Sequence, residues 1–269
     1  MSAFSQYLDL RPVGLKSKVH VYAAFLKGFF AKKVSPKKFI TIGQFLRSDC
    51  IVRYDSMLFY ARSHSEDIGY YAHTTKPDTF HWFKPASGET VVDCGSSVGL
   101  FTIIGLKNGS EVYAFEPNPS TFAILRKNID MNGFGNNAHI FNLGLSNEPG
   151  EMTLYAPNHF TGITSFEQKW VENLADKDKI TELKVKVTTP DHMLANVKKI
   201  DWLLIDVESF EYRLLLGSNN TLNKTDKIII EISNRNREKV KKLLADHGFI
   251  ETENGNEEES VQYYLYKRT

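Results

Sequence analysis

The feature that most constrains the fold is a short apolar strand, 90–94, that runs directly into a glycine-containing loop and then a helix. Strands that alternate with helices predict a parallel sheet covered on both faces. Six further strands are expected downstream, at 111–116, 138–143, 201–207, 227–232, 249–252 and 261–266. A short acidic loop joins the last two, which must therefore pair antiparallel. The pattern predicts an α/β, Rossmann-like fold whose seven-stranded, mostly parallel sheet ends in a C-terminal antiparallel hairpin.

A turn-rich stretch at 84–88 predicts a domain boundary. Residues 1–85 are expected to form an N-terminal extension of a helix and short strands, and residues 86–269 the main domain. In the helix expected at 15–34, apolar residues recur at helical spacing among lysines. We expect this helix to pack on its own domain, or on the same helix of a second subunit in a homodimer. Contact with an anionic membrane surface is the alternative.

Composition narrows the classes of partner. The chain has 33 Lys and Arg residues against 32 Asp and Glu residues, so it has no overall field that would draw it to nucleic acid. Cys50 and Cys94 cannot build a disulfide framework and lack the spacing of zinc ligands. The first residues are polar and lack the order of a secretory leader. We therefore expect a cytoplasmic protein without a nucleic-acid partner.

The loop after the first strand has the chemistry of a site for a cationic ligand. It begins at Asp93 and contains Gly95 and Gly99, with Ser96 and Ser97 between the glycines. Gly95 can form a tight turn that lets the backbone approach a ligand closely, and Gly99 lets the next helix pack near the strand. Asp93 stands where a diphosphate-binding loop has glycine. A carboxylate there favours the ammonium end of an amino acid over a diphosphate.

The next two strand ends extend this site. Glu116 ends the second strand about 20 positions beyond the glycine loop, where a carboxylate can accept both hydroxyls of a ribose. It would also repel a 2′-phosphate, and Pro117 follows it directly. Gly144 and Leu145 follow the third strand and are expected to border an adenine ring. The alternative is that Glu116 only caps the helix that begins near Asn118.

Three motifs together resemble the FkbM-type methyltransferase family. They are Val-Val-Asp-Cys-Gly-Ser-Ser-Val-Gly at 91–99, Phe-Glu-Pro-Asn-Pro at 115–119 and Ile-Asp-Val-Glu-Ser-Phe-Glu at 205–211, with a shorter likeness at 65–68. The resemblance covers residues 63–232. It implies a class I methyltransferase fold in which 86–269 binds S-adenosylmethionine and 1–85 caps the acceptor side. It also implies methyl transfer to a hydroxyl of a sugar, a glycan or another small molecule.

The chain departs from the family pattern at three places. Ser96 and Ser97 stand where Ala and Asn are usual, which changes how the loop is held. Ser209 stands where Gly is usual and can reshape the acceptor pocket, and Pro190 stands where Leu is usual. None of these changes removes an expected cofactor contact.

An acidic group after the fourth strand is the expected catalytic centre. Methyl transfer to a hydroxyl requires in-line positioning and removal of a proton. Asp206, Glu208 and Glu211 lie within one turn of each other, with Asp206 also beside the cofactor. Grouped carboxylates can share a proton or a divalent metal, but no metal is expected because no further ligand spacing is visible. The alternative is that Glu208 and Glu211 serve the next helix or orient Asp206.

Histidine is the alternative base, because its pKa lies near neutrality. Among the histidines in segments that can border an acceptor, His192 is favoured by its neighbour Asp191; the others are His73, His81 and His159.

Two other functions stay open at this point. One is N-methylation of an amine or a protein side chain, although the chain lacks the Asn-Pro-Pro-Tyr motif of amino-methylating enzymes. The other is a cofactor-binding module without catalysis, against which the acidic residues Asp93, Glu116 and Asp206 at successive strand ends weigh.

Overall fold

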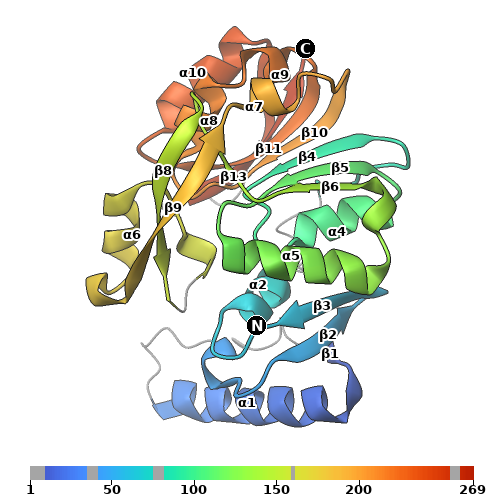
Figure 1. The fold of residues 1–269 in the computed structure, drawn as a ribbon, viewed down its shortest axis with the longest axis vertical. Coiled ribbons are helices and arrows are strands. Elements are labelled where there is room, and N and C mark those ends of the chain that lie inside the picture. The colour runs from blue at the N-terminus through green and yellow to red at the C-terminus, as the bar shows by residue number, and fades with distance from the viewer. Residues whose placement is uncertain (1–9, 35–41, 75–81, 159–160, 255–260) are drawn as a thin grey trace.

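A computed structural model describes the chain over residues 10–34, 42–74, 82–158, 161–254 and 261–269. A seven-stranded sheet forms its centre (Figure 1). Across the sheet the strands follow the order β12 (Phe249–Asn254), β13 (Val261–Arg268), β11 (Thr225–Ser233), β10 (Ile200–Ile205), β4 (Thr90–Cys94), β5 (Glu111–Phe115) and β6 (Ala138–Phe141). Neighbouring strands are parallel except that β13 is antiparallel to both β11 and β12. The predicted fold class is therefore confirmed.

Helices cover both faces of this sheet because alternate strand residues face opposite sides. The helices are α4 (Leu100–Lys107), α5 (Pro119–Asn132), α8 (Glu211–Leu216), α9 (Asn219–Asn223) and α10 (Arg237–Asp246). Val91 is buried in a cluster with residues of α4 and α5, whereas the next residue, Val92, is buried in a cluster with residues of α8 and α10. The sheet face that bears Val91 therefore packs on α4 and α5, which follow β4 and β5. The face that bears Val92 packs on α8 and α10.

Helix α5 has both of its predicted ends. The side chain of Asn118 accepts a hydrogen bond of 3.0 Å from the backbone N–H of Ser120, which satisfies one free donor of the first turn. Gly133 adopts a φ of 71°, a left-handed conformation that ends the helix at low cost for glycine.

A second, smaller sheet was not predicted. Its strand order is β7 (Gly144–Leu145), β9 (Ile180–Thr188) and β8 (Gly150–Pro157). The hairpin β8–β9 lies in the figure beside α8 and carries α6 (Gln168–Leu174) at its far end (Figure 1). This sheet fills the interval between β6 and β10, and it positions α6 near the end of β10 as described below.

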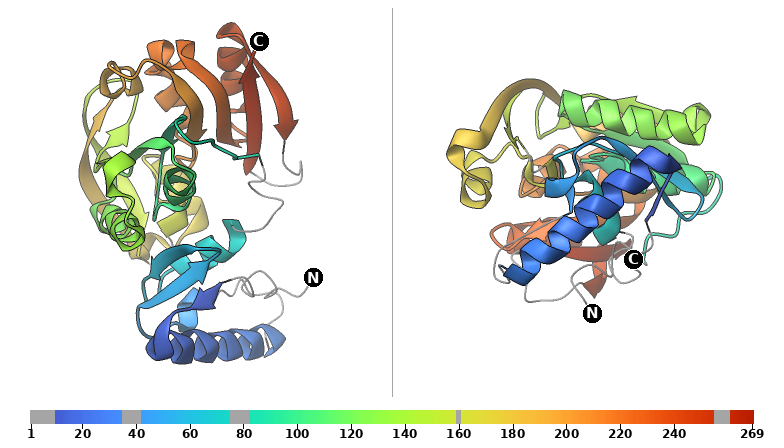
Figure 2. Two further views of the ribbon diagram at one scale, coloured as in Figure 1. Left: turned by 90° about the vertical axis from the view of Figure 1, so that its right-hand side faces the viewer. Right: turned by 90° about the horizontal axis from the view of Figure 1, so that it is seen from below.

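The N-terminal part forms a layer of its own below the main sheet (Figure 2). It contains β1 (Arg11–Pro12), α1 (Gly14–Val34), η2 (Gly43–Phe45), β2 (Cys50–Tyr54), β3 (Met57–Ala61) and α2 (Asp67–Thr74). Strands β2 and β3, two of the short strands expected in this part, form an antiparallel hairpin with Asp55 in a left-handed turn conformation at φ 51°. The helix expected at 78–83 lies mostly outside the described residues.

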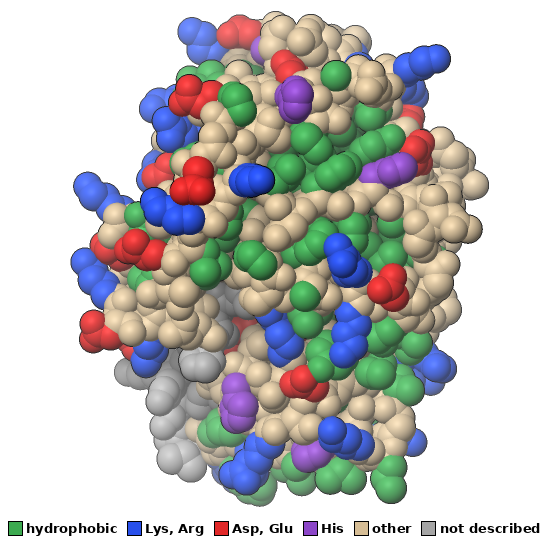
Figure 3. Space-filling view, in the orientation of Figure 1, with side chains coloured by type: hydrophobic (Ala, Val, Ile, Leu, Met, Phe, Trp, Pro, Cys, Tyr) green, Lys and Arg blue, Asp and Glu red, His purple; other side chains and the backbone are tan. Residues whose placement is uncertain are grey.

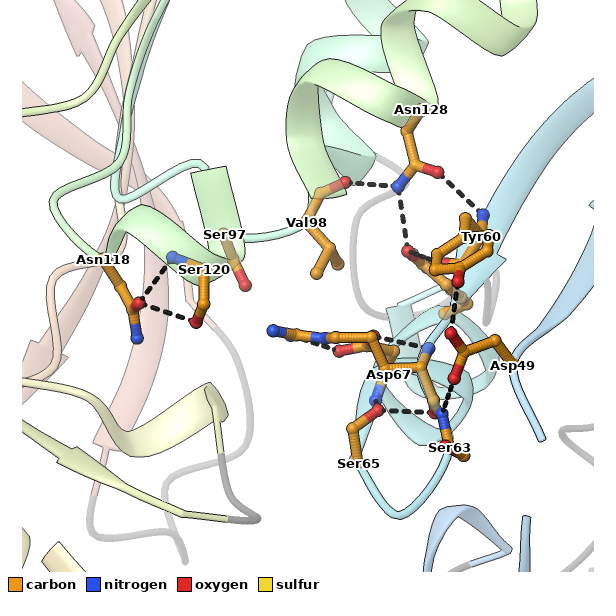
Figure 4. A network of polar contacts seen from close by, with 12 residues as sticks. Asp49, Tyr60, Ser63, Ser65, Asp67, Ser97, Val98, Asn118, Ser120 and Asn128 are labelled. Carbon is orange, nitrogen blue, oxygen red and sulfur yellow. Dashed lines mark hydrogen bonds and ion pairs between the residues drawn. The ribbon is translucent and has the colours of Figure 1, made fainter. Parts of the chain in front are cut away.

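Two asparagine side chains on α5 bind the edge of β3, and Figure 4 shows one of them, Asn128. The Asn132 amide accepts from the N–H of Leu58 at 2.8 Å and donates to the carbonyl of the same residue at 2.7 Å. The Asn128 amide accepts from the N–H of Tyr60 at 2.7 Å and donates to Val98 O at 2.7 Å and to a tyrosine hydroxyl of α2. These amides satisfy backbone groups that a neighbouring strand would otherwise satisfy.

The N-terminal part and the main sheet share one hydrophobic cluster. Val52 and Phe59, in the N-terminal sheet of β1, β2 and β3, belong to the cluster that contains Val91 and Leu125. The division into residues 1–85 and 86–269 stays a prediction. The shared hydrophobic cluster contains residues from both of these parts. None of the helices in the described part of the chain has the length and hydropathy needed to cross a bilayer.

We expect Asn128→Ala to lower the free energy of unfolding by about 2–3 kcal/mol, because it leaves buried backbone groups of Tyr60 and Val98 without partners. Urea unfolding followed by circular dichroism measures this. The exposed Asn136→Ala is the control and should change stability by less than about 0.5 kcal/mol. Equal effects of the two substitutions would contradict the anchoring role of Asn128.

Candidate active site

The glycine loop brings three strand ends together. Gly95 has a φ of 84°, and a Cβ atom there would lie 1.8 Å from the backbone oxygen of Asp206, so no side chain fits. The N–H groups of Gly95 and Ser96 both donate to Phe115 O at 3.0 Å, and Asp206 N donates to Cys94 O at 3.0 Å. The ends of β4, β5 and β10 therefore converge on one loop.

Glu116 holds this loop from the end of β5. Its two carboxylate oxygens accept hydrogen bonds from Ser97 N at 2.9 Å and from Asn118 N at 2.8 Å. Burial raises the pKa of Glu116 to about 7 despite these bonds. The side chain of Asn142 donates to the backbone oxygens of Glu116 and Pro117, which fixes the same strand end. Glu116 thus makes the contact with the start of α5 that the helix-capping alternative expects. Each of its two carboxylate oxygens still has a lone pair for a ligand.

Asp93 lies at the end of β4 and is buried. Its carboxylate accepts a hydrogen bond of 2.6 Å from the Thr102 hydroxyl of α4. Burial, together with the nearby charge of Asp206, raises the pKa of Asp93 to about 7. Two neighbouring strand ends therefore carry carboxylates that keep a proton up to neutral pH.

A cluster of three carboxylates lies at the ends of β10 and β11. Asp206, Glu208 and Glu231 each have an oxygen within 4.8 Å of the others. Burial raises the pKa of all three, and mutual repulsion adds to this for Glu208 and Glu231. Asp206 accepts a hydrogen bond of 2.7 Å from the hydroxyl of Tyr263, and Glu208 accepts one of 3.2 Å from the indole N–H of Trp170. We call Asp206, Glu208 and Glu231 the acidic cluster.

The backbone at Glu208 and Ser209 is left-handed, with φ values of 49° and 73°. The Ser165 hydroxyl donates to Glu208 O at 2.6 Å, and Arg235 and Asn236 both donate to Ser209 O. The glycine usual at position 209 in FkbM-type sequences adopts this conformation freely, whereas serine adopts it at a cost. The surrounding donors hold the turn, and the turn places the Glu208 side chain in the acidic cluster.

Glu211 does not belong to this cluster, contrary to the prediction. It is fully buried, and its Oε1 accepts hydrogen bonds from the backbone N–H and the hydroxyl of Ser233 and from the Asn236 amide. Glu231 takes the place expected for Glu211. The register pairs Ile205 with Ile230, so Asp206 and Glu231 are the next residues at the same edge of the sheet. Glu231 ends the predicted fifth strand, and the sequence suggested that it hydrogen-bonds the substrate or binds a helix, but did not group it with Asp206 and Glu208.

His192 also lies away from the cluster. It is exposed on α7 (Pro190–Met193), and the carboxylate of the preceding residue, Asp191, binds backbone N–H groups at the start of α9. Lys224 directly precedes β11 and donates to Leu194 O just after α7. His192 therefore lies at the amino-terminal edge of the sheet, opposite the acidic cluster, and we no longer count it among the bases. His81 and His159 lie outside the described residues, as does the side chain of His73.

Gly144 and Leu145 form the buried strand β7, which pairs with β9. A Cβ atom on Gly144 would lie 2.6 Å from Phe166 Cζ, so only glycine fits against that ring. Phe141, at the end of β6, stacks on Phe115 with ring centroids 5.0 Å apart. That Gly144 and Leu145 border an adenine ring stays a prediction.

Two tyrosines and an arginine near the site were missed by the sequence argument. The charges of Asp206, Asp93 and Glu231 add to burial in raising the pKa of Tyr70, on α2, well above its ordinary value. Tyr263, on β13, donates its hydroxyl to Asp206. Arg62 binds Asp67 through two hydrogen bonds of 2.8 Å and acts electrostatically on Glu116. The N-terminal part therefore reaches the carboxyl-terminal edge of the main sheet, which no local sequence pattern indicated.

This arrangement gathers negative charge in a poorly hydrated place. In the described ranges, no lysine or arginine forms an ion pair with Asp93 or with any member of the acidic cluster. Unpaired buried carboxylates either keep a proton or require a cationic ligand. Chemically, the site can bind a cation and can accept a proton from a bound molecule.

Comparison with known proteins agrees with this geometry. The sequence profile of the methyltransferase FkbM domain matches residues 93–257. A protein called methyltransferase 1 from Beauveria bassiana is 28% identical over 178 residues, which cover 59% of this chain and 71% of the relative. The hexuronic acid methyltransferase AglP from Haloferax volcanii is 28% identical over 146 residues, covering 52% of this chain and 54% of the relative.

A solved structure has the same fold. The FkbM methyltransferase from Methylobacillus flagellatus superposes with a TM-score of 0.50 at 15% sequence identity, covering 74% of this chain and 52% of that one. This chain thus spans about half the length of that protein. The sequence match covers more than half of the chain, and the strand order agrees with it. The chain belongs to the FkbM family and is a methyltransferase with the class I fold.

Proposed function

We propose that the protein transfers the methyl group of S-adenosylmethionine to a hydroxyl oxygen of a sugar, a glycan or another small acceptor. The observation that carries this proposal is the set of buried carboxylates at adjacent strand ends, none of which pairs with a lysine or arginine among the described residues. S-adenosylmethionine bears a sulfonium and an ammonium against a single carboxylate. A ligand with a net positive charge therefore suits this site, and a diphosphate does not.

The residues present fit such a cofactor. Glu116 retains lone pairs for the ribose hydroxyls at the end of β5, and Gly95 leaves room for close approach at the loop. Asp93 and Asp206 flank this loop and suit the amino-acid end, and the buried Ser96 hydroxyl, which lacks a hydrogen-bond partner in the described structure, is a further group for it. When bound, S-adenosylmethionine supplies an electrophilic methyl group on a positively charged sulfur.

Glu208 is our choice for the residue that removes the acceptor proton. Burial and the nearby charge of Asp206 raise the pKa of its carboxyl group well above the ordinary value, which makes its carboxylate a stronger base once it is ionised. The Trp170 indole of α6 donates to its carboxylate and the Ser165 hydroxyl donates to its backbone oxygen, so the segment between β8 and β9 holds it in place. Glu208 would accept the hydroxyl proton while the methyl carbon exchanged its bond to the cofactor sulfur for one to the acceptor oxygen, leaving a neutral thioether, and would then pass the proton to solvent.

We propose that this step proceeds without a metal ion. The acidic cluster has the spacing of a divalent-cation site. However, the Tyr263 hydroxyl and the Trp170 indole point their donor hydrogens at two of its three carboxylates. These hydrogens occupy lone pairs that a divalent metal ion would need as ligands, so the cluster suits a proton or an organic cation better than a metal ion.

An amine acceptor is the second candidate function, because a protonated amine would also suit the acidic cluster. The relative from Haloferax volcanii, a hexuronic acid methyltransferase, supports a sugar instead. Incubation with labelled S-adenosylmethionine and a panel of neutral glycans and amines, followed by mass spectrometry, distinguishes them. Label found only on nitrogen would overturn O-methylation, and no label on any acceptor would favour a binding module.

We expect Glu116→Ala to weaken S-adenosylmethionine binding by about 1–3 kcal/mol, because the ribose hydroxyls lose a buried acceptor. Isothermal titration calorimetry measures the change. Glu111→Ala is the matched control, since Glu111 begins the same strand at the opposite edge and is exposed. Tighter binding of NAD than of S-adenosylmethionine to the unmodified protein would contradict the cofactor assignment.

We expect the thermal stabilisation by S-adenosylmethionine to grow as the pH rises from about 5.5 to about 8. Asp93 and Glu116 have pKa values of about 7 in the folded chain, so the free protein loses stability over this range as folding opposes their ionisation. A cationic ligand favours the ionised carboxylates and offsets that loss. Differential scanning fluorimetry measures the shift in Tm.

S-adenosylhomocysteine is the control ligand for this experiment, because its sulfur is neutral. Its stabilising effect should depend less on pH. Equal Tm shifts by S-adenosylmethionine at both ends of the pH range would show that the carboxylates do not respond to the charge of the ligand.

We expect Glu208→Gln to retain cofactor affinity and to lower kcat by roughly 10²–10⁴-fold, the usual contribution of a general base. His192→Gln should leave kcat unchanged, because that residue lies at the opposite edge of the sheet. A chelator should not affect either protein. Loss of activity with chelator and its return with Mg²⁺ would assign a metal to the acidic cluster.

A further inference from the structure

Helix α1 exposes an unusual number of large apolar side chains. Six of the nine large hydrophobic residues that are at least half exposed in the described structure belong to this one helix. Five of them, which we call the α1 stripe, are exposed by 57–80%: Leu15, Val19, Tyr22, Leu26 and Phe30. Phe29 lies beside the stripe, in edge contact with Phe30. Scattered apolar residues on a surface are ordinary, but a contiguous row marks an interaction site.

The α1 stripe is a single face of the helix. Its residues are spaced by four, three, four and four positions, so they lie along one line in a helix of about 3.6 residues per turn. Ser17, Val21, Ala24 and Gly28 are buried at a similar spacing on the opposite face. The Ser17 hydroxyl accepts a hydrogen bond from the N–H of Ile51, on β2. Small residues thus attach the helix to its own domain, and the bulky ones face outward.

Charge on α1 indicates what the stripe contacts. The helix contains five lysines and no Asp or Glu, although the whole chain has a net charge of only +1. Lys16, Lys18 and Lys27 are exposed and flank the stripe on its two sides, and Lys33 lies at its end. Pairing with the same helix in a second copy would bring these like charges together. An apolar row between lysines instead matches helices that lie in the interface of an anionic membrane.

The position of α1 leaves the stripe accessible to a flat surface. The helix forms the outermost described layer at the end of the molecule opposite α9 and α10 (Figure 2). Green apolar side chains line that lower end, with blue lysine and arginine side chains next to them (Figure 3). The N-terminal part that α1 belongs to also carries Tyr70, on α2, on which the charges of Asp206 and Glu231 act.

We propose that α1 docks the protein peripherally on an anionic lipid bilayer. The α1 stripe lies among the acyl-chain boundary atoms, and the lysines contact the headgroups. The helix lies in the plane of the surface and does not span the membrane, in agreement with its hydropathy. The proposal is independent of the acceptor, because it concerns the face of α1 opposite the catalytic crevice.

Vesicle flotation tests the proposal with the full chain. The protein should float with vesicles of phosphatidylcholine that contain phosphatidylglycerol, and should float poorly with phosphatidylcholine alone. Leu26→Ser with Phe30→Ser should lower the bound fraction by more than about tenfold, because it removes the apolar contact. Lys16→Gln with Lys27→Gln should lower it by roughly an order of magnitude and reduce its dependence on salt.

Matched controls come from the same chain. Leu216→Ser with Ile250→Ser changes two apolar residues that are 51% and 53% exposed outside α1, and Lys184→Gln with Lys186→Gln removes two exposed lysines of β9. Both control proteins should bind vesicles like the unmodified chain. Circular dichroism melting should show that every variant is folded.

Two outcomes overturn the proposal. The first is that the unmodified chain binds anionic vesicles and that the substitutions at Leu26 and Phe30 do not reduce this binding. The second is the absence of vesicle binding together with a dimer, seen by light scattering, that these substitutions convert to a monomer; the stripe would then be an interface between two copies. Methylation of a water-soluble acceptor by the variants reports separately on the catalytic site.

Discussion

The contact between Gly95 and the backbone of Asp206 determines where every functional side chain lies. Because the α-carbon of Gly95 approaches the Asp206 carbonyl too closely for any Cβ atom, β4 and β10 end side by side. The loop then turns toward β5, where Glu116 binds the N–H of Ser97. Asp93, Glu116 and Asp206 thereby meet at one edge, as expected at the switch point of an open parallel sheet.

Burial at this edge divides the acidic residues into two kinds. Glu211 accepts three hydrogen bonds and stabilises the turn that carries Glu208 and Ser209, so its role is structural. Burial raises the pKa values of Asp206, Glu208 and Glu231, and the charge of Asp206 adds to this for Glu208 and Glu231. The turn thus depends on a carboxylate whose Oε1 is held by three donors, and the chemistry on carboxylates that accept fewer hydrogen bonds.

Local patterns predicted the sheet, and they failed where side chains from distant segments meet. The strand and helix sequence after 88 and the caps of α5, Asn118 and Gly133, were readable because each depends on neighbours in the chain. Glu211 was expected beside Asp206 and Glu208 because the three are close in sequence, whereas the structure groups those two with Glu231 of the neighbouring strand. The hairpin β8–β9 was missed, since its strands pair with each other across a long interval of polar residues. Helix α1 packs on its own domain as expected. The sequence could not show which face of α1 is buried, because the segments that it packs against become known only with the fold.

The amides of Asn128 and Asn132 also fix the N-terminal layer in register. Four residues of a helix rise about 6.0 Å, and two residues of a strand rise about 6.7 Å, so side chains four apart on α5 match alternate peptide groups of β3. A slide of β3 by a single residue would bring to both amides residues whose N–H and C=O groups point the other way, toward β2, and would break these bonds together. The amides thereby tie the N-terminal layer, which carries Tyr70, to α5. We therefore expect the segment with Ser165 and Trp170, which holds Glu208, to be the part that moves when an acceptor binds.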